Sequence, residues 1–211
     1  MQCFLYRLLR ALTVPGLLFL IATNTSAVRA NTLLVLGDSI SAAYGMSLDK
    51  GWVALLAGRM AAPYPDHTVV NASISGETTD GALRRIDTLL AEHKPSVVLI
   101  ELGGNDGLRG FPIDRFRNNL RQLTHKSQAA GAGVILAAIR IPPNYGSRYT
   151  TSFHDSYALV AKETESILAP FILEGIATDP TLMQADGIHP RAEAQQALLD
   201  NLYPYIEEAL Q

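Results

Sequence analysis

The chain has 211 residues, and its 17 lysines and arginines against 20 aspartates and glutamates give a formal net charge of −3. This length suits a single domain with a hydrophobic core of its own. The modest acidic balance, without a basic stripe, excludes the electrostatic footprint of a nucleic-acid-binding protein.

The first 30 residues have the three-part pattern of a secretory signal peptide. Arg7 and Arg10 form a basic start, an apolar stretch covers residues 11–22, and the small residues Ala27 and Ala30 offer two cleavage points. A membrane anchor is the alternative interpretation, but an apolar stretch of about 12 residues is short for a bilayer, which needs about 20. We therefore expect residues 1–30 to be removed on export to the periplasm or the medium.

Removal of this segment changes the composition of the mature protein, which we expect to be a single domain of residues 31–211. Three arginines and no acidic residue leave with the segment, so 14 basic side chains remain against 20 acidic ones, a net charge of −6. Cys3 is the only cysteine and leaves too, which excludes disulfides and thiolate chemistry in the mature protein. We expect a monomer without a stable membrane anchor.

Short apolar runs alternate with amphipathic segments along the rest of the chain. The runs lack the period-two alternation of half-exposed strands, as is usual for strands of a parallel sheet that is covered on both faces. We predict strands at residues 32–36, 68–71, 97–101, 134–139 and 171–173, and helices at about 51–60, 78–92, 113–130, 151–168 and 191–210. This alternation predicts an α/β sandwich around a parallel sheet of about five strands.

Polar and glycine-rich segments follow four of the predicted strands. They cover residues 37–39, 72–76, 102–106 and 140–145. In open parallel sheets, ligands bind beyond the carboxyl ends of the strands. We therefore expect the functional site at this edge of the sheet.

Ser39 is the candidate nucleophile, because it follows an apolar strand and a glycine in Gly37-Asp38-Ser39. A sharp turn at that point would leave its hydroxyl exposed. A serine hydroxyl is a poor nucleophile until a base takes its proton and an anion holds that base in the right tautomer. In the competing interpretation Ser39 only caps the next helix, a common role for serine.

Asp186 and His189 are the candidate acid and base. Their i, i+3 spacing, just before Pro190, can place both on one face of a turn. The carboxylate can then accept a hydrogen bond from one ring nitrogen while the other nitrogen points outward. In the competing interpretation Asp186 caps a turn and His189 is a surface histidine. The presence of Ser39 in the same chain favours a Ser-His-Asp triad.

Three groups are candidates for an oxyanion hole, which acyl transfer needs for the charge on the former carbonyl oxygen. Asn105 offers a side-chain amide after the third strand, Gly76 a backbone N–H after the second, and Ser39 its own N–H. Gly76 has no Cβ, so its backbone can approach a ligand closely. All three could instead be ordinary turn residues.

Other chemistries lack their motifs in this sequence. There is no Gly-x-Ser-x-Gly elbow, no His-Glu-x-x-His, no Gly-x-Gly-x-x-Gly and no Walker loop. The remaining histidines lie at positions 67, 93, 125 and 154, without metal-ligand spacing. We expect neither a metal nor another cofactor.

These residues resemble the motifs of the SGNH, or GDSL, hydrolase family. The family's four landmarks match Ser39 in Gly37-Asp38-Ser39-Ile40, Gly76, Asn105 in Gly103-Gly104-Asn105-Asp106, and His189 in Asp186-Gly187-Ile188-His189-Pro190. Segments 101–111 and 143–146 are similar to the bacterial branch described as thioesterase I/protease I/lysophospholipase L1 or arylesterase. The resemblance covers essentially all of residues 31–211.

The resemblance implies a flavodoxin-like three-layer α/β/α fold and a metal-free serine hydrolase of acyl esters, thioesters or lysolipids. Its triad would be Ser39, His189 and Asp186, and its oxyanion hole Ser39, Gly76 and Asn105. The resemblance also implies a mobile loop at about residues 107–112 that closes over an acyl chain. Candidate substrate contacts are Leu108, Phe111, Ile141 and Asn144.

Two other functions are possible on the same scaffold. A carbohydrate O-acetylesterase would have a narrow polar acyl site, and the apolar residues near the expected loop argue against it. A non-catalytic periplasmic binding module would be expected to have a broken triad, whereas all three residues are present. The sequence leaves the physiological substrate and the acyl-chain length open, because the shape of the pocket decides among them.

Overall fold

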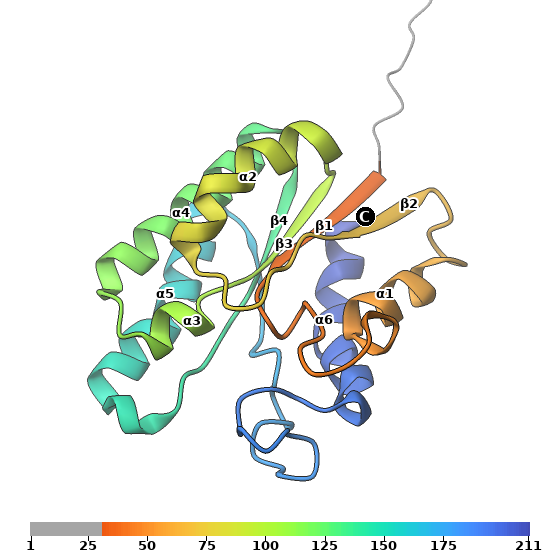
Figure 1. The fold of residues 1–211 in the computed structure, drawn as a ribbon. Helices are drawn as coiled ribbons and strands as arrows, with labels where there is room; N and C mark the ends of the chain where they lie inside the picture. The colour runs from red at the N-terminus through yellow and green to blue at the C-terminus, as the bar shows by residue number, and fades with distance from the viewer. Residues whose placement is uncertain (1–30) are drawn as a thin grey trace, which may run out of the picture.

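The computed structural model describes residues 31–211, so the predicted signal peptide and Cys3 lie outside the described residues. Five parallel strands form a sheet in the order β2-β1-β3-β4-β5 (Figure 1). The strands are β1 (Asn31–Gly37), β2 (His67–Asn71), β3 (Val97–Glu101), β4 (Gly133–Ala137) and β5 (Ile167–Ala169). The α-helices are α1 (Trp52–Met60), α2 (Thr79–His93), α3 (Gly104–Leu108), α4 (Ile113–Ala129), α5 (Ser147–Thr164) and α6 (Gln195–Ala209). Among these described residues, no helix is both long and apolar enough to cross a bilayer.

Helices cover both faces of the sheet and produce three layers (Figure 1). The helices α1 and α6 pack together on one face, while α2, α4 and α5 lie side by side on the other. The central strands are therefore sealed from water on both faces, and every residue from Leu33 to Leu36 and from Val98 to Ile100 is 0% exposed. Two buried faces explain why these strands read as uninterrupted apolar runs. The predicted α/β/α sandwich with about five parallel strands is confirmed.

The prediction of a last strand at residues 171–173 is wrong. The edge strand β5 lies earlier, at the predicted end of the helix at residues 151–168. That helix, α5, stops before Glu165, whose left-handed backbone (φ 53°) cannot continue it. Residues 171–173 run through turns instead, and their apolar character comes from burial, since Ile172 is 0% exposed. The other predicted elements agree with the structure to within a few residues.

The strands β1 and β3 lie side by side where the strand order reverses. From β1 the chain moves to β2 on one side and then crosses back to β3, β4 and β5 on the other. Ligand sites in doubly wound sheets form at this reversal, beyond the carboxyl ends of the strands. The loops that follow β1 and β3 flank this position.

Candidate active site

Ser39 lies in a tight turn directly after β1. The chain leaves the strand through Gly37, where a Cβ would lie 2.6 Å from Ser41 Cβ and 2.8 Å from Ser73 Oγ. Only glycine fits between these two neighbouring segments. The local sequence thus places the serine next to the point where the β1 turn packs against the loop after β2.

The imidazole of His189 joins Ser39 to Asp186. Its Nε2 lies 2.9 Å from Ser39 Oγ, and its Nδ1 lies 2.7 Å from Asp186 Oδ2. A carboxylate can only accept hydrogen bonds, so Nδ1 carries the hydrogen and Nε2 is left to accept from the Ser39 hydroxyl. The next helical elements begin at Leu48 and Trp52 behind other N-cap residues, so the helix-capping interpretation of Ser39 is wrong.

Asp186 is fixed by the turn that it caps. Its Oδ1 accepts from the backbone N–H groups of Ile188 at 2.9 Å and His189 at 3.0 Å, while Oδ2 faces the imidazole. Partial burial opposes ionisation, but these hydrogen bonds outweigh it and lower the pKa of the carboxyl to about 2. One carboxylate therefore caps the turn and also holds the ring of His189.

Tyr44 covers the ring of His189 from a third direction. The ring centroids lie 4.2 Å apart with an angle of 32° between the planes, and the backbone carbonyl of Tyr44 accepts from Gln184 Nε2 at 2.9 Å. Tyr44 was not predicted as a site residue, because an aromatic residue in a turn after the candidate nucleophile has no spacing signal of its own.

Gly76 and Asn105 approach the same edge from the loops after β2 and β3. Gly76 has a φ of +78°, a conformation that favours glycine, whereas a Cβ there would meet nothing nearer than 3.9 Å beyond its chain neighbours. Backbone conformation, rather than crowding, is what requires the glycine. The N–H of Ile74 donates to the Gly37 carbonyl at 3.1 Å and ties this loop to the Ser39 turn.

Asn105 lies in the first turn of α3, a short helix that the sequence analysis did not predict. Its Nδ2 donates to Asp38 Oδ2 at 3.2 Å. A side-chain amide has two N–H groups, so one can bind Asp38 while the other serves a ligand. Asp38, the middle residue of Gly37-Asp38-Ser39, thus orients the candidate oxyanion donor.

Two buried carboxyls, Asp38 and Glu101, lie beside this site, and neither was predicted to have a role. Glu101, at the end of β3, is 0% exposed; its Oε2 accepts from the Ser41 hydroxyl at 2.6 Å and from the Asp38 N–H at 3.4 Å. Burial raises the pKa of Asp38 to about 6, and burial together with the charge of Asp38 raises the pKa of Glu101 well above its usual range. Each of the two buried carboxyls therefore opposes the ionisation of the other.

A mostly apolar cavity of about 390 Å³ opens beside the Ser39–His189 pair. Ile40, Gly104 and Ile188, which are chain neighbours of Ser39, Asn105 and His189, form its near wall. The segments after β4 and β5 supply much of the rest, through Ile139, Ile141, Phe171, Leu173 and Met183. The cavity thus adjoins the chain neighbours of the candidate site residues, and its mostly apolar lining suits an apolar ligand group.

The predicted substrate contacts divide into two pairs. Leu108 and Ile141 line the cavity, whereas Phe111 and Asn144 are not among its lining residues. Phe111 instead packs under the Arg115 guanidinium, whose carbon lies 4.9 Å from the ring centroid. The predicted mobility of residues 107–112 stays a prediction; this segment comprises the end of α3 and the turn into α4.

The arrangement supplies the groups that acyl transfer requires: a hydroxyl, a base held by an anion, and amide donors beside an apolar cavity. Metal-assisted chemistry would need a cluster of ligands. Within residues 31–211, no three His, Cys, Asp or Glu side chains are grouped to hold a metal ion.

Comparisons with known proteins point to one family. Residues 35–197 match the GDSL-like lipase/acylhydrolase family. Esterase TesA of Pseudomonas aeruginosa is 50% identical over 202 residues, which cover 96% of this chain and 100% of that protein. Thioesterase 1/protease 1/lysophospholipase L1 of Escherichia coli is 46% identical over 183 residues, 87% of this chain and 86% of that protein. A crystal structure of TesA, 51% identical, covers 85% of this chain and 99% of its own with a TM-score of 0.82.

Proposed function

The chain belongs to the GDSL-like lipase/acylhydrolase family, and from this premise we propose that it hydrolyses carboxylic esters and thioesters through Ser39, His189 and Asp186. One observation carries the proposal: Ser39 Oγ lies 2.9 Å from His189 Nε2, and His189 Nδ1 lies 2.7 Å from Asp186. The esterase and thioesterase names of the two relatives support the substrate class.

In the acylation step, His189 Nε2 takes the proton of Ser39 as Oγ bonds to the carbonyl carbon of the substrate. Asp186 holds His189 in the tautomer that carries its hydrogen on Nδ1 and stabilises the imidazolium that forms. The N–H groups of Ser39 and Gly76 and the amide of Asn105 receive the oxyanion. When the tetrahedral intermediate collapses, the alcohol or thiol leaves with the proton from His189, and the acyl group stays on Ser39.

In the deacylation step, water replaces the leaving group. His189 takes a proton from the water as its oxygen attacks the acyl carbon, and the same donors receive the second oxyanion. Collapse returns the proton to Ser39 Oγ and releases the carboxylic acid. No group beyond the chain and water is needed to balance either step.

The apolar cavity supports an acyl chain longer than acetyl as the preferred substrate group. Each methylene that it removes from water contributes about 0.8 kcal/mol. A carbohydrate O-acetylesterase would gain nothing from walls such as Phe171, Leu173 and Met183. The cavity therefore favours an acyl hydrolase over that alternative.

We also propose export through residues 1–30, which lie outside the described part of the chain, to the periplasm or the medium. The basic, apolar and small-residue pattern of this segment supports the proposal. The mature protein would act as a monomer without a membrane anchor, on small acyl substrates.

The test uses residues 31–211 with p-nitrophenyl esters from acetate to palmitate and an acyl-coenzyme A thioester, with Ser39→Ala beside wild type. We expect activity that rises beyond acetate and falls to background in the variant, with both proteins equally folded by circular dichroism. Equal activity in both proteins would remove Ser39 as nucleophile. A rate that is highest for acetate would favour the acetylesterase.

A further inference from the structure

The loops that carry Gly76 and Asn105 are not paired to each other in the sheet. The strand β1 lies between β2 and β3, so the strand hydrogen bonds connect the two loops only through β1. An exposed side chain makes one direct link, since Arg109 Nη2 donates to the Gly76 carbonyl at 3.1 Å. A second link is buried, and it joins the residue after Asn105 to the start of α2.

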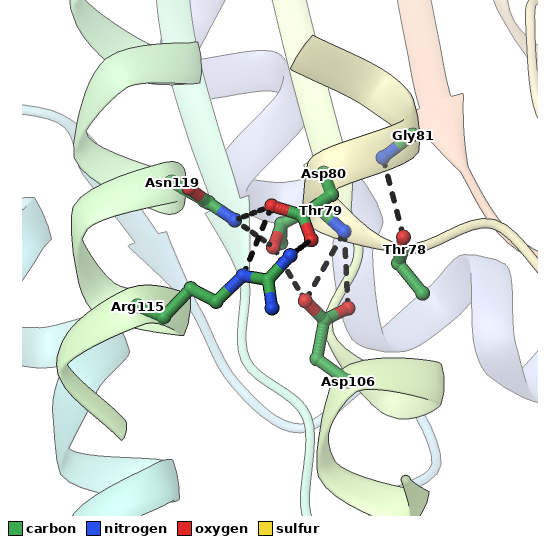
Figure 2. A network of polar contacts seen from close by, with 7 residues as sticks. All are labelled: Thr78, Thr79, Asp80, Gly81, Asp106, Arg115 and Asn119. Carbon is green, nitrogen blue, oxygen red and sulfur yellow. Dashed lines mark hydrogen bonds and ion pairs between the residues drawn. The ribbon is translucent and has the colours of Figure 1, made fainter. Parts of the chain in front are cut away.

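Asp106 is the centre of this buried link (Figure 2). Its carboxylate is 0% exposed and points at Thr79, the first residue of α2, which is also 0% exposed. The Thr79 N–H donates to Asp106 Oδ2 at 3.0 Å, and the Thr79 hydroxyl donates to Oδ1 at 2.5 Å. The first N–H groups of a helix lack partners within it and favour an anion, which explains why a buried carboxylate is stable here.

The direction of the hydroxyl bond is set by a third helix. Asn119 of α4 donates from Nδ2 to Thr79 Oγ1 at 3.1 Å and to Asp80 Oδ1 at 2.7 Å. Asp80 is also paired with Arg115 (Figure 2). The Asn119 amide can only donate to the Thr79 oxygen and the Asp106 carboxylate can only accept, so the one hydrogen of the hydroxyl is directed to Asp106. Burial raises the pKa of Asp106, and the two bonds from Thr79 oppose that rise.

Gly76 precedes Thr79 by three residues, and Asn105 directly precedes Asp106. We propose that Asp106 is a positioning residue which, through its hydrogen bonds to the N–H and the hydroxyl of Thr79, sets the separation of the Gly76 and Asn105 oxyanion donors. The inference rests on the proposed function. Asp106 touches no substrate and acts only through the two loops that it holds together.

The primary test changes the Thr79 hydroxyl and measures hydrolysis of a p-nitrophenyl ester. Thr79→Val keeps the shape and the N–H but removes the hydroxyl, and a donor displaced by a fraction of an ångström should lower kcat about 10- to 100-fold. KM should stay within about twofold, since the cavity is untouched. Thr79→Ser restores the hydroxyl and should recover kcat. Lys126→Gln, which breaks the exposed Lys126–Asp87 ion pair between α4 and α2, should match wild type.

A double-mutant cycle separates positioning from a general loss of structure. In an Asn105→Ala background, Thr79→Val should lower kcat by less than about threefold, because residues that act as one unit are not additive. A full tenfold loss in that background would overturn the proposal, as would a folded Thr79→Val with the kcat of wild type. Asp106→Asn takes the place of Thr79→Val if circular dichroism shows that the valine variant does not fold.

The outcomes also separate this inference from the proposed function. Wild-type hydrolysis that survives in Ser39→Ala would overturn both. Hydrolysis that depends on Ser39 but ignores Thr79→Val would overturn only the positioning role.

Discussion

The ring of His189 is held on three sides by residues close to it in space. Asp186 binds Nδ1, Ser39 lies at Nε2, and the ring of Tyr44 packs against the imidazole at a tilt of 32°. A base held in this way needs little reorganisation when the proton moves, which is the advantage of a preorganised site. The sequence motif contains the first two partners but gives no sign of the third.

The amide of Asn105 should matter for the transition state rather than for substrate binding. Removal of one oxyanion donor typically lowers kcat about 10²- to 10³-fold. We predict that loss for Asn105→Ala, with KM changed by less than about threefold, measured by steady-state hydrolysis of a p-nitrophenyl ester. An unchanged kcat in a folded variant would remove Asn105 from the oxyanion hole.

Asp186 gives the stability of the protein a defined dependence on pH. Its pKa is about 2 in the folded chain against an ordinary 3.8, so its contribution is full above pH 3.8 and is lost as the pH falls through about 2. Because the side chain is partly exposed, we expect Asp186→Asn to lower the free energy of unfolding by only about 1 kcal/mol at pH 7. Urea unfolding should show this difference shrinking as the pH falls from about 4 to 2. A difference that stays constant over that range would contradict the assignment.

Short-range motifs made the candidate reacting residues recognisable in the sequence, whereas the burial of the acids depends on tertiary structure. Each candidate motif is a short run of neighbouring residues, so its spacing is visible in the sequence: Gly37-Asp38-Ser39 and Asp186-Gly187-Ile188-His189. Glu101 reads as the polar end of a strand, and only the packing of the Ser39 turn over it shows that it is sealed from water. The Thr79–Asp106 contact joins residues 27 positions apart, so no local pattern predicts it.

The central strands of the sheet were predictable from the sequence, whereas the edge strand β5 was not. The strands β1 and β3 were predictable because burial on both faces leaves an apolar run. β5 was missed because an edge strand of three residues has little pattern of its own, and Leu168 is 38% exposed. The stronger apolar run at 171–173 belongs to the cavity wall, where burial comes from tertiary packing rather than from a strand.

Partly filling the cavity tests whether the acyl chain of the substrate binds against this wall. Ala177 lines it from the segment after β5, and Ala177→Trp should exclude about two methylenes of a long acyl chain. At about 0.8 kcal/mol each, kcat/KM for dodecanoate should fall roughly tenfold relative to acetate. Ala91→Trp, at an exposed position on α2, is the matched control and should leave the ratio unchanged. An unaltered ratio in Ala177→Trp would show that the acyl chain lies elsewhere.

For the molecule as a whole, the reversal of strand order between β1 and β3 assembles residues that lie far apart in the chain. Ser39, Gly76 and Asn105 follow β1, β2 and β3 in turn, and His189 reaches them from the segment before α6. Parallel topology makes this gathering predictable, because all carboxyl ends share one edge. The strand order and the cavity could not be predicted from the sequence, since both depend on which helices cover which face of the sheet.

The central claim is that Ser39 is the nucleophile and His189 its base, and a covalent trap tests it most directly. Residues 31–211 would be treated with an alkyl fluorophosphonate, and the modified residue located by peptide mass spectrometry. We predict one adduct per chain, on Ser39, absent from Ser39→Ala and formed at least about 100-fold more slowly in His189→Ala. An adduct on another residue, or equal labelling of wild type and Ser39→Ala, would contradict the account.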